Sequence, residues 1–405
     1  MSPARAPRIL VLVCDSFGVG GAPDAAAYGD EGSDTLGNCS RAVGGIHAPN
    51  LERLGLGLLT DIQGVAARAE PGTAHGTLIE RSAGKDTTTG HWEMCGIVLD
   101  RPFPLYPKGF PPEVIEHFQA QIGRKVLGNV PASGTEIIAE LGEEHMRSGR
   151  PIVYTSGDSV FQIACHEEVV PLPMLYQWCR VARRILTGEH AVGRVIARPF
   201  TGTPRNFVRM PERRDFSVPP PQRTVLDFCR EAGVGVYGVG KIQDIFAGQG
   251  MSEARYSDSN DHGVDVTLEY LRRPAPALVF TNLVDFDSKY GHRNDPSGYA
   301  ACVVALDRRI PDLVRALDGG VMFLTGDHGC DPTTPSTDHS RERTPLLATG
   351  VPDGPLDLGA RPTFADLGAT VADLLDVQTE GLAGESFGKE LGFDHLGRTA
   401  TSLEG

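Results

Sequence analysis

The amino-acid sequence predicts an α/β fold with a largely parallel central sheet flanked by helices, plus an inserted α+β domain. Three short apolar runs, Ile9–Cys14, Leu278–Leu283 and Gly320–Thr325, have the unbroken hydrophobic character of strands that are buried on both faces. Helical patterns lie between such runs, over residues 222–232 and from Pro296 onward. Alternation of strands and helices is typical of a parallel sheet, because each crossover helix packs on one face of the sheet.

Composition and charge place the chain among ordinary globular proteins and exclude one class of partner. Its 405 residues are 40% hydrophobic and 22% charged. At about 100–150 residues per domain, this length suggests two or three domains. The net charge of -14 argues against nucleic-acid binding, because phosphate backbones are held by clustered Lys and Arg. An anionic small substrate would need a local positive site, which bound metal ions can supply.

Cysteine usage and the lack of long apolar stretches indicate a reducing compartment. The eight cysteines are scattered, with no CxxC spacing and no short disulfide framework. The apolar run Ile9–Cys14 is shorter than the ~7–15 residues of a signal-peptide core. No later stretch approaches the ~20 apolar residues of a membrane span. We therefore expect a cytoplasmic protein without membrane contact.

The first predicted strand leads into a glycine-rich loop that carries the first acidic candidate. Asp15 follows Ile9–Cys14 directly, at the carboxyl end of a strand, where ligands collect in open α/β sheets. A capping or turn role would explain Asp15 if it stood alone. The GVGG of this loop lacks GxGxxG spacing, so it does not indicate a nucleotide site. Further on, Pro49–Leu56 is expected to form a short amphipathic helix.

Three consecutive threonines follow an acidic residue in the segment GKDTTTGHWE, residues 84–93. Gly90 and the polar flanks favour a loop that leads into a helix. Asp86 and Thr87 then lie at the helix amino terminus, where a capping role for the pair and a nucleophilic role for Thr87 are compatible. A hydroxyl at that position lies in the positive end of the helix dipole, which stabilises an incoming phosphate.

Two proline-rich segments bracket the predicted insertion over residues 101–221. They are RPFPLYPKGFPP, residues 101–112, and VPPP, residues 218–221. Between them, helix and strand patterns indicate a small α+β unit. The expected helices are Pro111–Gly123 and Gly134–Gly149, and the expected strands are Pro151–Ser156, Val160–Cys165 and Arg194–Phe200. Residues 1–100 and 222–405 would then form one discontinuous core domain.

The carboxyl-terminal part resumes the alternation of helices and strands. We expect a helix over Gln222–Ala232, a strand over Val234–Val239 and a long helix from Pro296. Pro311 lacks the amide hydrogen that a continuous helix needs, so a kink or a restart is expected there. The tail after about Phe393 is polar and without apolar periodicity, which indicates a loosely held end.

Acidic residues and histidines follow three predicted strands, and together they indicate a metal centre. Strand Leu278–Leu283 is followed by VDFDSKYGHRNDP, and strand Gly320–Thr325 by GDHGCDPTTPSTDH. The carboxyl ends of neighbouring parallel strands meet at one edge of the sheet. The six candidate donors are Asp15, Asp287, His292, Asp327, His328 and His339. Six oxygen and nitrogen donors without a thiolate suffice for two three-ligand sites for manganese or a similar divalent ion, with positions left open for reactants.

The charge balance of these donors favours phosphate chemistry. Three carboxylates against two divalent ions leave about one net positive charge, which can accept a phosphate dianion. A threonine hydroxyl is a poor nucleophile at neutral pH unless a metal or a base removes its proton. Thr87 is therefore the candidate metal-bridging nucleophile.

Seven motifs spread over the chain carry a family resemblance: DSFGVGGAPDA, GSDTLGN, GKDTTTGHWE, TSGDS, GKIQDIF, NLVDFDSKYGHRNDP and GDHGCDPTTPSTDH. Together they resemble the phosphopentomutase family of the alkaline phosphatase superfamily, over nearly the whole chain from about Arg8 to Gly392. The resemblance implies an alkaline-phosphatase-like core, with residues 101–221 as a cap that closes over the active site. It also implies an isomerase that interconverts ribose 1-phosphate and ribose 5-phosphate, and their deoxyribose analogues, through a 1,5-bisphosphate.

The same resemblance assigns the metal ligands and the nucleophile. Thr87 would be a phosphothreonine that bridges two Mn²⁺ ions, for which Mg²⁺ or another divalent ion could substitute. One metal would be held by Asp287, His292 and His339, and the other by Asp15, Asp327 and His328. A sugar bisphosphate would serve as the activator that primes the enzyme.

The resemblance further implies substrate contacts outside the metal centre. Ser156 and Asp158 of the cap would contact the sugar, although an ordinary turn would also explain them. Arg209 and Lys241 would contact the substrate phosphate, because a guanidinium and an ammonium are its expected partners. Solvated basic residues are the alternative for both. A pentose phosphate is then the expected partner, and we expect a monomer that requires no protein partner.

Two alternatives remain open from the sequence. The first is another enzyme of this scaffold, namely a metal-dependent phosphatase, a phosphodiesterase or a cofactor-independent phosphoglycerate mutase. The second is a noncatalytic protein that binds metal or sugar phosphate. A turnover assay with pentose phosphate distinguishes both from a mutase.

Overall fold

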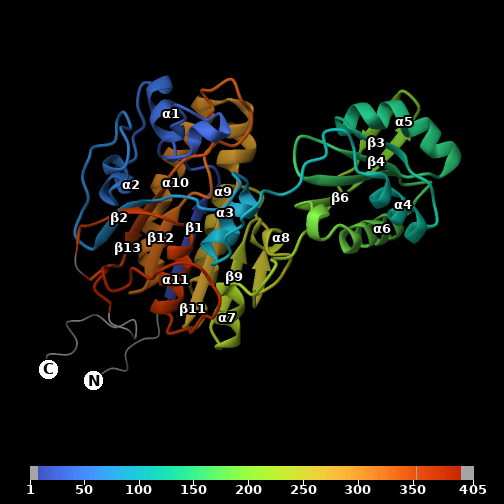
Figure 1. Cartoon of the computed structure of the whole chain (residues 1–405). Coiled ribbons are helices and arrows are strands. Elements are labelled where there is room, and N and C mark those ends of the chain that lie inside the picture. Colours follow the sequence, from blue (N-terminus) through green and yellow to red (C-terminus); the bar gives the residue numbers. More distant parts are fainter. Residues whose placement is uncertain (1–7, 353, 394–405) are drawn as a thin grey trace. The chain divides into compact units, whose positions relative to one another are not determined.

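The computed structural model describes residues 8–352 and 354–393 and divides the chain into two compact units (Figure 1). The core unit comprises the residues up to Arg101 and those from Pro220 onward, and the inserted unit comprises Pro102–Pro219. The tail predicted to be loosely held after Phe393 lies outside the described residues.

Within the described residues, the core unit is built on an eight-stranded sheet in which one strand runs against the others. In the order in which they pair, the strands are β10 (Glu253–Arg255), β9 (Gly235–Val239), β11 (Ala277–Leu283), β1 (Arg8–Cys14), β12 (Val321–Thr325), β13 (Thr344–Thr349), β2 (Thr73–Leu78) and β14 (Leu356–Arg361). Strand β13 pairs antiparallel with β12 and β2, and the other pairs are parallel. The predicted α/β fold with a largely parallel central sheet is therefore confirmed.

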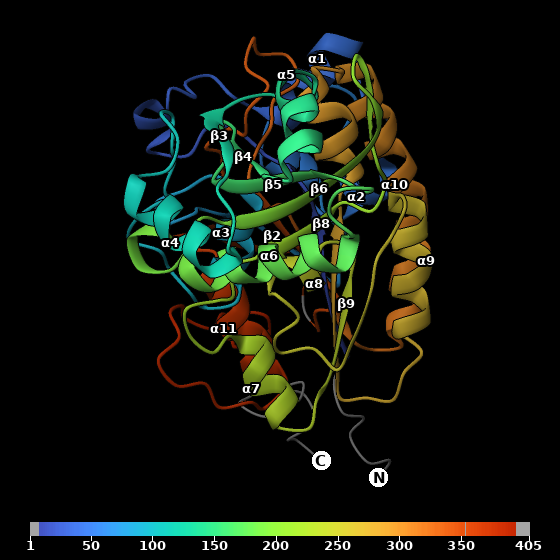
Figure 2. The ribbon, with the colours of Figure 1, turned by 90° about the vertical axis from the view of Figure 1, so that its right-hand side faces the viewer.

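Helices cover both faces of this sheet, as Figures 1 and 2 show. On one face, α10 (Pro296–Leu317) packs against α1 (Thr35–Val43), α2 (Pro49–Arg53) and α9 (Asn260–Tyr270). The other face carries α3 (Thr87–Met94), α7 (Val225–Glu231), α8 (Ile242–Ile245) and α11 (Ala365–Leu374). Successive side chains of β1 pack alternately against the helices on the two faces, because side chains of a strand point to opposite faces of the sheet. Leu10 and Leu12 join the apolar cluster that includes α10, whereas Val11 lines a small cavity together with residues of α3, α7 and α11.

The inserted unit has a mixed six-stranded sheet with helices on both faces. Its strands are β3 (Leu127–Pro131), β4 (Ile152–Thr155), β5 (Val160–His166), β6 (Arg194–Thr203), β7 (Asn206–Arg209) and β8 (Arg214–Ser217), and its helices are α4 (Pro112–Ile122), α5 (Gly134–Ser148) and α6 (Leu172–Ile185). The pairs β3–β4 and β5–β6 are parallel, and the remaining pairs are antiparallel. Helix α5 covers one apolar cluster, and α4 and α6 cover the other.

Short turns complete the two units. They are the 3₁₀ turns η1 (Ala25–Tyr28), η2 (Leu56–Leu58), η3 (Gly188–His190) and η5 (Gly291–Arg293), and the π-helical turn η4 (Phe286–Tyr290). The helix predicted over Pro49–Leu56 is thus shorter than expected, because α2 ends at Arg53 and η2 follows as a separate turn.

Helix α10 continues through Pro311 as one uninterrupted helix of 22 residues, so of the expected kink or restart, the restart does not occur and the kink stays a prediction. A proline leaves the carbonyl group four residues earlier without its helical partner, and here that group belongs to Asp307. The side chain of Asn50 donates to this oxygen at 3.0 Å. The Asp307 carboxylate in turn accepts from the backbone N–H groups of Asn50 and Leu51 at 2.8 Å each. Contacts with α2 therefore replace the hydrogen bond that Pro311 removes.

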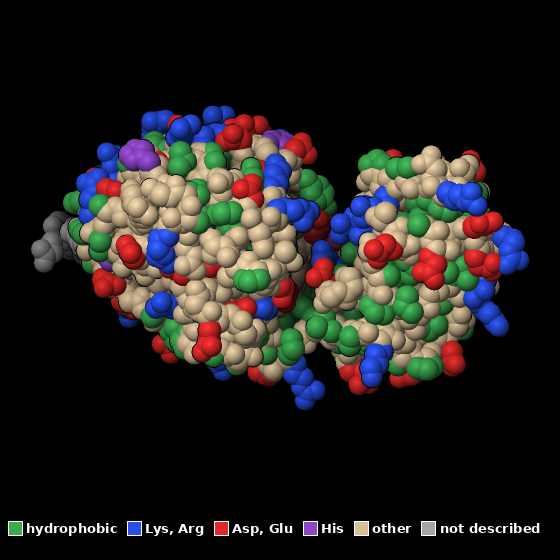
Figure 3. All heavy atoms as spheres, turned by 90° about the horizontal axis from the view of Figure 1, so that it is seen from above, with side chains coloured by type: hydrophobic (Ala, Val, Ile, Leu, Met, Phe, Trp, Pro, Cys, Tyr) green, Lys and Arg blue, Asp and Glu red, His purple; other side chains and the backbone are tan. Residues whose placement is uncertain are grey.

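The surface is polar and carries charges of both signs. Figure 3 shows Lys and Arg side chains interspersed with Asp and Glu on the visible face of each unit. None of the helices that the structure describes combines the length and apolarity that crossing a membrane requires. The eight cysteines are free and buried, in line with the absence of a disulfide framework in the sequence.

Candidate metal centre

Three adjacent parallel strands bring the predicted ligands to one edge of the core sheet. Strand β1 lies between β11 and β12, and all three run in the same direction. Asp15 follows β1 directly, Asp287 lies in η4 after β11, and one residue separates Asp327 from the end of β12. The backbone N–H of Asp15 donates to the carbonyl oxygen of Leu283 at 3.1 Å, which holds the first two strand ends together.

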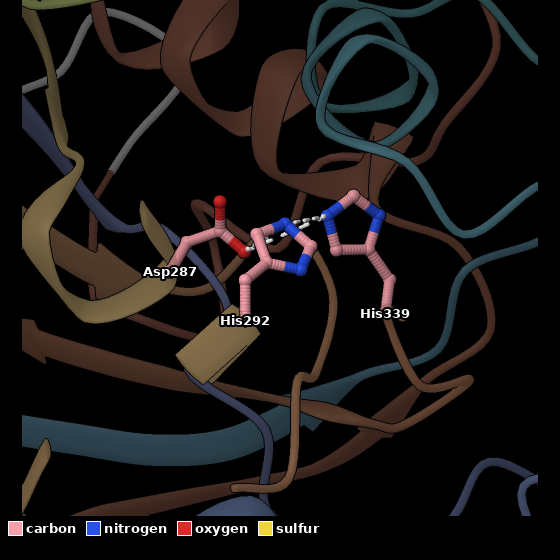
Figure 4. Close-up of side chains that lie close together, drawn as sticks. All are labelled: Asp287, His292 and His339. Atoms are coloured by element: carbon pink, nitrogen blue, oxygen red, sulfur yellow. Dashed lines mark hydrogen bonds and ion pairs between the residues drawn. The ribbon is translucent and has the colours of Figure 1, made fainter. Parts of the chain in front are cut away.

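The first ligand group consists of Asp287, His292 and His339 (Figure 4). The Oδ1 atom of Asp287 lies 3.3 Å from Nε2 of His292 and 3.5 Å from Nε2 of His339. The two Nε2 atoms are 3.2 Å apart. On its other side, Nδ1 of His292 contacts the carbonyl oxygen of Thr337 at 2.6 Å, so Nδ1 carries the proton and donates it. This contact orients the ring so that Nε2 faces the other two ligand atoms.

The second ligand group consists of Asp15, Asp287 and His328, whose ligand atoms lie within 4.8 Å of one another. Nε2 of His328 is 3.4 Å from Oδ1 of Asp15 and 3.4 Å from Oδ2 of Asp327. Asp287 thus belongs to both groups, whereas the resemblance assigns it to one. Asp327 borders this second group: its Oδ1 accepts from the backbone N–H of Ser16 at 3.0 Å, and its Oδ2 is the oxygen that faces His328.

Three buried carboxylate oxygens in this cluster accept no hydrogen bond among the described residues. They are Oδ1 of Asp15, Oδ1 of Asp287 and Oδ2 of Asp327. Buried polar atoms are nearly always satisfied, and an isolated buried carboxylate is strongly disfavoured. Converging anionic oxygens with imidazole nitrogens beside them are a donor set that fits divalent cations such as Mn²⁺, Mg²⁺ or Zn²⁺. The residues present therefore fit a two-metal centre.

The electrostatic field of the cluster stabilises positive charge. Burial raises the pKa of Asp15, but the Lys241 ammonium and the His328 ring outweigh burial and bring the pKa down to about 2. Burial likewise opposes ionisation of Asp287, yet the rings of His292 and His339 hold its pKa well below the ordinary range. The Asp287 carboxylate, whose Oδ1 lies 3.3 Å from Nε2, raises the pKa of His292 to about 11. A site that holds its acids ionised and favours protonated imidazoles is one that attracts cations.

Lys241 lies against the ligand carboxylates of the core unit. Its Nζ atom is 2.8 Å from Oδ2 of Asp15 and 3.8 Å from Oδ2 of Asp287. Lys241 is the residue directly before the short helix α8, which lies on the face of the sheet that also carries α3. The ammonium thus neutralises part of the negative charge at the two strand ends, and its expected contact with a substrate phosphate stays a prediction.

The candidate nucleophile lies at the amino terminus of α3, as the sequence predicts. The Asp86 side chain caps this helix by accepting from the backbone N–H groups of Thr88 at 3.0 Å and Thr89 at 3.1 Å. Those two amides are therefore engaged with Asp86 and are not free for a phosphate. Oγ1 of Thr87 lies 3.2 Å from Nε2 of His328, which places the hydroxyl at the second ligand group. Helix α3 packs closely against the backbone of Asp327 because residue 90 is glycine. A Cβ atom at this position would lie 2.3 Å from the carbonyl oxygen of Asp327.

The remaining predicted substrate residues lie in the inserted unit. Ser156 and Asp158 form the turn between β4 and β5, where the Asp158 backbone N–H donates to Ser156 Oγ at 3.4 Å. The Asp158 carboxylate is 3.5 Å from Arg194. Arg209 is the last residue of β7 and is exposed. Their roles in substrate binding stay predictions.

His91 is a buried member of the site that the sequence analysis missed. Its Nδ1 lies 2.8 Å from the carbonyl oxygen of Thr87 and 3.3 Å from Oδ2 of Asp327. A carbonyl oxygen can only accept, so Nδ1 carries the proton and faces both groups. The available signal was spacing: His91 follows Thr87 by four residues, one helical turn, on the helix that the sequence predicts.

Arg341 is a second residue that the sequence analysis missed. Its guanidinium is buried and donates to Oε2 of Glu80 at 2.6 Å, and to the carbonyl oxygens of Ser82 at 2.9 Å and Gly84 at 2.6 Å. It thereby holds the loop that precedes the candidate nucleophile against the segment that follows His339. Sequence alone offers no pattern that links positions so far apart.

The sequence matches a family model and several known proteins. A model of the metalloenzyme superfamily matches residues 7–379. A phosphopentomutase of Kosmotoga olearia is 55% identical over 95% of this chain and 99% of its own length. A phosphopentomutase of Anaeromyxobacter dehalogenans is 58% identical over 94% of this chain and 97% of its own length. One of Caldanaerobacter subterraneus subsp. tengcongensis is 54% identical over 91% of this chain and 94% of its own length.

Proposed function

Because the chain belongs to the metalloenzyme superfamily and, within it, to the phosphopentomutase family, we propose that it interconverts ribose 1-phosphate and ribose 5-phosphate, together with their deoxyribose analogues. As a member of this family the chain is an enzyme of the isomerase class. The single observation that carries the detailed proposal is the placement of a threonine hydroxyl 3.2 Å from a histidine of a carboxylate and imidazole cluster.

Thr87 acts as the phosphate carrier in this proposal. Transfer begins when the bond between phosphorus and Thr87 Oγ1 breaks and the free hydroxyl of a pentose monophosphate forms the new bond to phosphorus. The sugar hydroxyl loses its proton in this step and Thr87 Oγ1 takes one up to become a hydroxyl again, so the products are a 1,5-bisphosphate and the unphosphorylated threonine. The bisphosphate then presents its other phosphate to Thr87, which regenerates the phosphothreonine and releases the isomeric monophosphate. A priming sugar bisphosphate supplies the first phosphate.

The ligand side chains set the geometry and charge for this transfer. When bound, two divalent ions supply positive charge that offsets the carboxylates and polarises the phosphoryl oxygens. We propose that His292 and His339 share Asp287 in one ligand set, while Asp15, His328 and Asp327 form the other. Manganese is the proposed ion.

Asp86, His91 and Arg341 hold the nucleophile in place. Asp86 fixes the first turn of α3, and His91 holds the Thr87 carbonyl group. Arg341 anchors the preceding loop. A nucleophile held in one geometry needs little reorganisation before transfer, which is the positional advantage that enzymes gain from bound reactants.

The inserted unit is proposed to act as the cap. In that role Ser156 and Asp158 are proposed to bind the sugar, and Arg209 and Lys241 are proposed as contacts of the substrate phosphate. A bound sugar hydroxyl in the acceptor position excludes water, which favours transfer over hydrolysis. We further propose that the protein is cytoplasmic, since its eight buried free thiols fit a reducing compartment. We also propose that it is a monomer.

The product of the reaction tests the proposal. Ribose 5-phosphate, supplied with Mn²⁺ and a priming bisphosphate, is expected to give ribose 1-phosphate with little inorganic phosphate. Asp158→Ala is expected to raise the fraction of phosphate lost to water, whereas Glu116→Ala, which removes an exposed carboxylate from α4, leaves that fraction unchanged. Inorganic phosphate as the main product of the unaltered protein would replace the mutase assignment by a phosphatase.

A further inference from the structure

The residue that follows Asp15 has an unusual backbone conformation for its type. Ser16 has φ of 70°, in the left-handed region that residues with a Cβ atom disfavour, and its side chain is fully buried. Such a conformation persists only where the surrounding structure enforces it. At Ser16 the enforcement comes from partners of its backbone, since its own Oγ has no hydrogen-bond partner among the described residues.

The Ser16 N–H group restrains a candidate ligand on a different strand. It donates to Oδ1 of Asp327 at 3.0 Å. This bond fixes the rotation of the Asp327 carboxylate, so that Oδ2 is the oxygen left near His328, at 3.4 Å. Since Ser16 is joined to Asp15 by a peptide bond, one residue couples the positions of two candidate ligands.

The Ser16 carbonyl group is held by a buried tyrosine. The Tyr299 hydroxyl donates to this oxygen at 2.9 Å. Tyr299 lies in the first turn of α10, which Asp295 caps by accepting from the Gly298 N–H, so its backbone is fixed. The hydroxyl therefore reaches Ser16 from a rigid support.

The Tyr299 ring also contacts the segment that carries the shared ligand. Its centroid lies 5.5 Å from that of Phe286, the residue before Asp287. Phe286 in turn packs edge-on against Phe17, with centroids 5.4 Å apart. One aromatic side chain is thus attached to the loop after β1 by a hydrogen bond and to the segment after β11 by ring packing.

From these contacts we infer that Tyr299 is a positioning residue of the metal centre, which acts through Ser16. Its hydroxyl holds the Ser16 peptide in the left-handed conformation, and in that conformation the Ser16 N–H holds Asp327 in place beside His328. The inference rests on the proposed two-metal centre and adds to it a residue that touches neither metal ligands nor substrate through its hydroxyl. Residues that orient metal ligands typically affect metal affinity by about 10- to 100-fold.

The test removes one oxygen atom and measures metal binding directly. Tyr299→Phe keeps the ring packing against Phe286 and deletes only the hydroxyl. In calorimetric titrations of the metal-free full-length chain, Tyr299→Phe is expected to bind Mn²⁺ about 10-fold or more weakly than the unaltered protein. Its turnover number at saturating Mn²⁺ is expected to recover, with an unchanged KM for the sugar phosphate, because the variant alters ligand placement and not the substrate contacts.

A matched control separates this effect from a general loss of packing. Tyr270→Phe deletes another buried hydroxyl of the core unit, which donates to Glu253 at 3.2 Å from the end of α9. This control is expected to leave Mn²⁺ affinity unchanged. Equal weakening in both variants would overturn the inference, and so would unchanged Mn²⁺ affinity in Tyr299→Phe.

Substitutions at Ser16 test the proposed route. Ser16→Gly and Ser16→Ala both keep the backbone groups, so each is expected to bind Mn²⁺ as the unaltered protein does. In the Ser16→Gly background, Tyr299→Phe is expected to cost less affinity, because glycine adopts positive φ readily. A loss of Mn²⁺ affinity in Ser16→Ala would show that the hydroxyl itself is required and would overturn a backbone route. Absence of Mn²⁺ binding by the unaltered protein would overturn the metal centre itself, which distinguishes the two failures.

Discussion

Replacement of Thr87 by alanine is expected to abolish turnover with little change in the free energy of unfolding, because this side chain makes few contacts that stabilise the fold. Its hydroxyl contacts Nε2 of His328 at 3.2 Å, while Asp86 provides the cap of α3. Loss of one polar contact costs about 1 kcal/mol at most. For a chain of this size, that cost shifts Tm by no more than roughly 2–4 °C. Removal of a covalent nucleophile, by contrast, lowers turnover by roughly 10⁴-fold or more.

Three measurements on the same preparations check this prediction. Calorimetry follows Tm, a coupled assay follows formation of ribose 1-phosphate, and mass spectrometry of peptides locates phosphate after incubation with a sugar bisphosphate. Thr88→Ala is the control, because it removes the same atoms one position further along α3 and keeps the contact between Thr87 and His328. If Thr87→Ala retains turnover, or if the phosphate is found on Thr88 or Thr89, the assignment of the nucleophile is refuted.

Further outcomes concern the metal, pH and the long helix. Chelation is expected to abolish turnover and added Mn²⁺ to restore it, and full turnover after exhaustive metal removal would contradict the two-metal centre. Burial lowers the pKa of His145 from its ordinary 6.5, so the unfolded chain binds the His145 proton more tightly and the contribution of this residue to the free energy of unfolding falls as pH drops through about 6.5. Denaturant titrations check this sign: over that pH range, the free energy of unfolding of the unaltered protein should fall relative to that of His145→Gln. Asn50→Ala should lower the free energy of unfolding by about 1–3 kcal/mol, because it removes the side-chain donor to the Asp307 carbonyl and to Oδ2 of its carboxylate, whose Oδ1 keeps two backbone donors. The loss should shrink when Pro311→Ala restores the helical N–H, and additive effects in that double-mutant cycle would refute the coupling.

The strand ends and the helix cap were accessible to sequence reasoning because their signals are local. An apolar run that stops at Asp15 or Asp327 marks the end of a buried strand, whatever lies around it. Asp86 before a threonine run is a cap signal confined to a few residues, and the structure places a cap there. Local chemistry of this kind therefore predicted where the candidate ligands would gather.

Other features depend on residues far apart in the sequence and could not be predicted. The membership of Asp287 in both ligand groups follows from distances across β1 and β11. The continuity of α10 depends on Asn50, which lies 257 positions from Asp307. Strands β7 and β8 have four residues each. The first is largely exposed and the second largely half-buried, so neither has a buried apolar pattern, and both pair with β6. Helix α6 was not predicted from the sequence, because arginines alternate with its apolar residues. Those apolar residues pack into one apolar cluster of the inserted unit.

The position of β1 in the middle of the core sheet has a consequence for synthesis on the ribosome. Residues 8–14 leave the ribosome long before their partners, residues 277–283 and 321–325. At about 5–20 residues per second, β1 waits roughly 15–60 s before β12 has been made. The inserted unit, by contrast, is contiguous from Pro102 to Pro219 and has apolar clusters of its own. It can therefore fold while the apolar strand β1 is still unpaired, so that this strand stays exposed to non-native contacts during that interval.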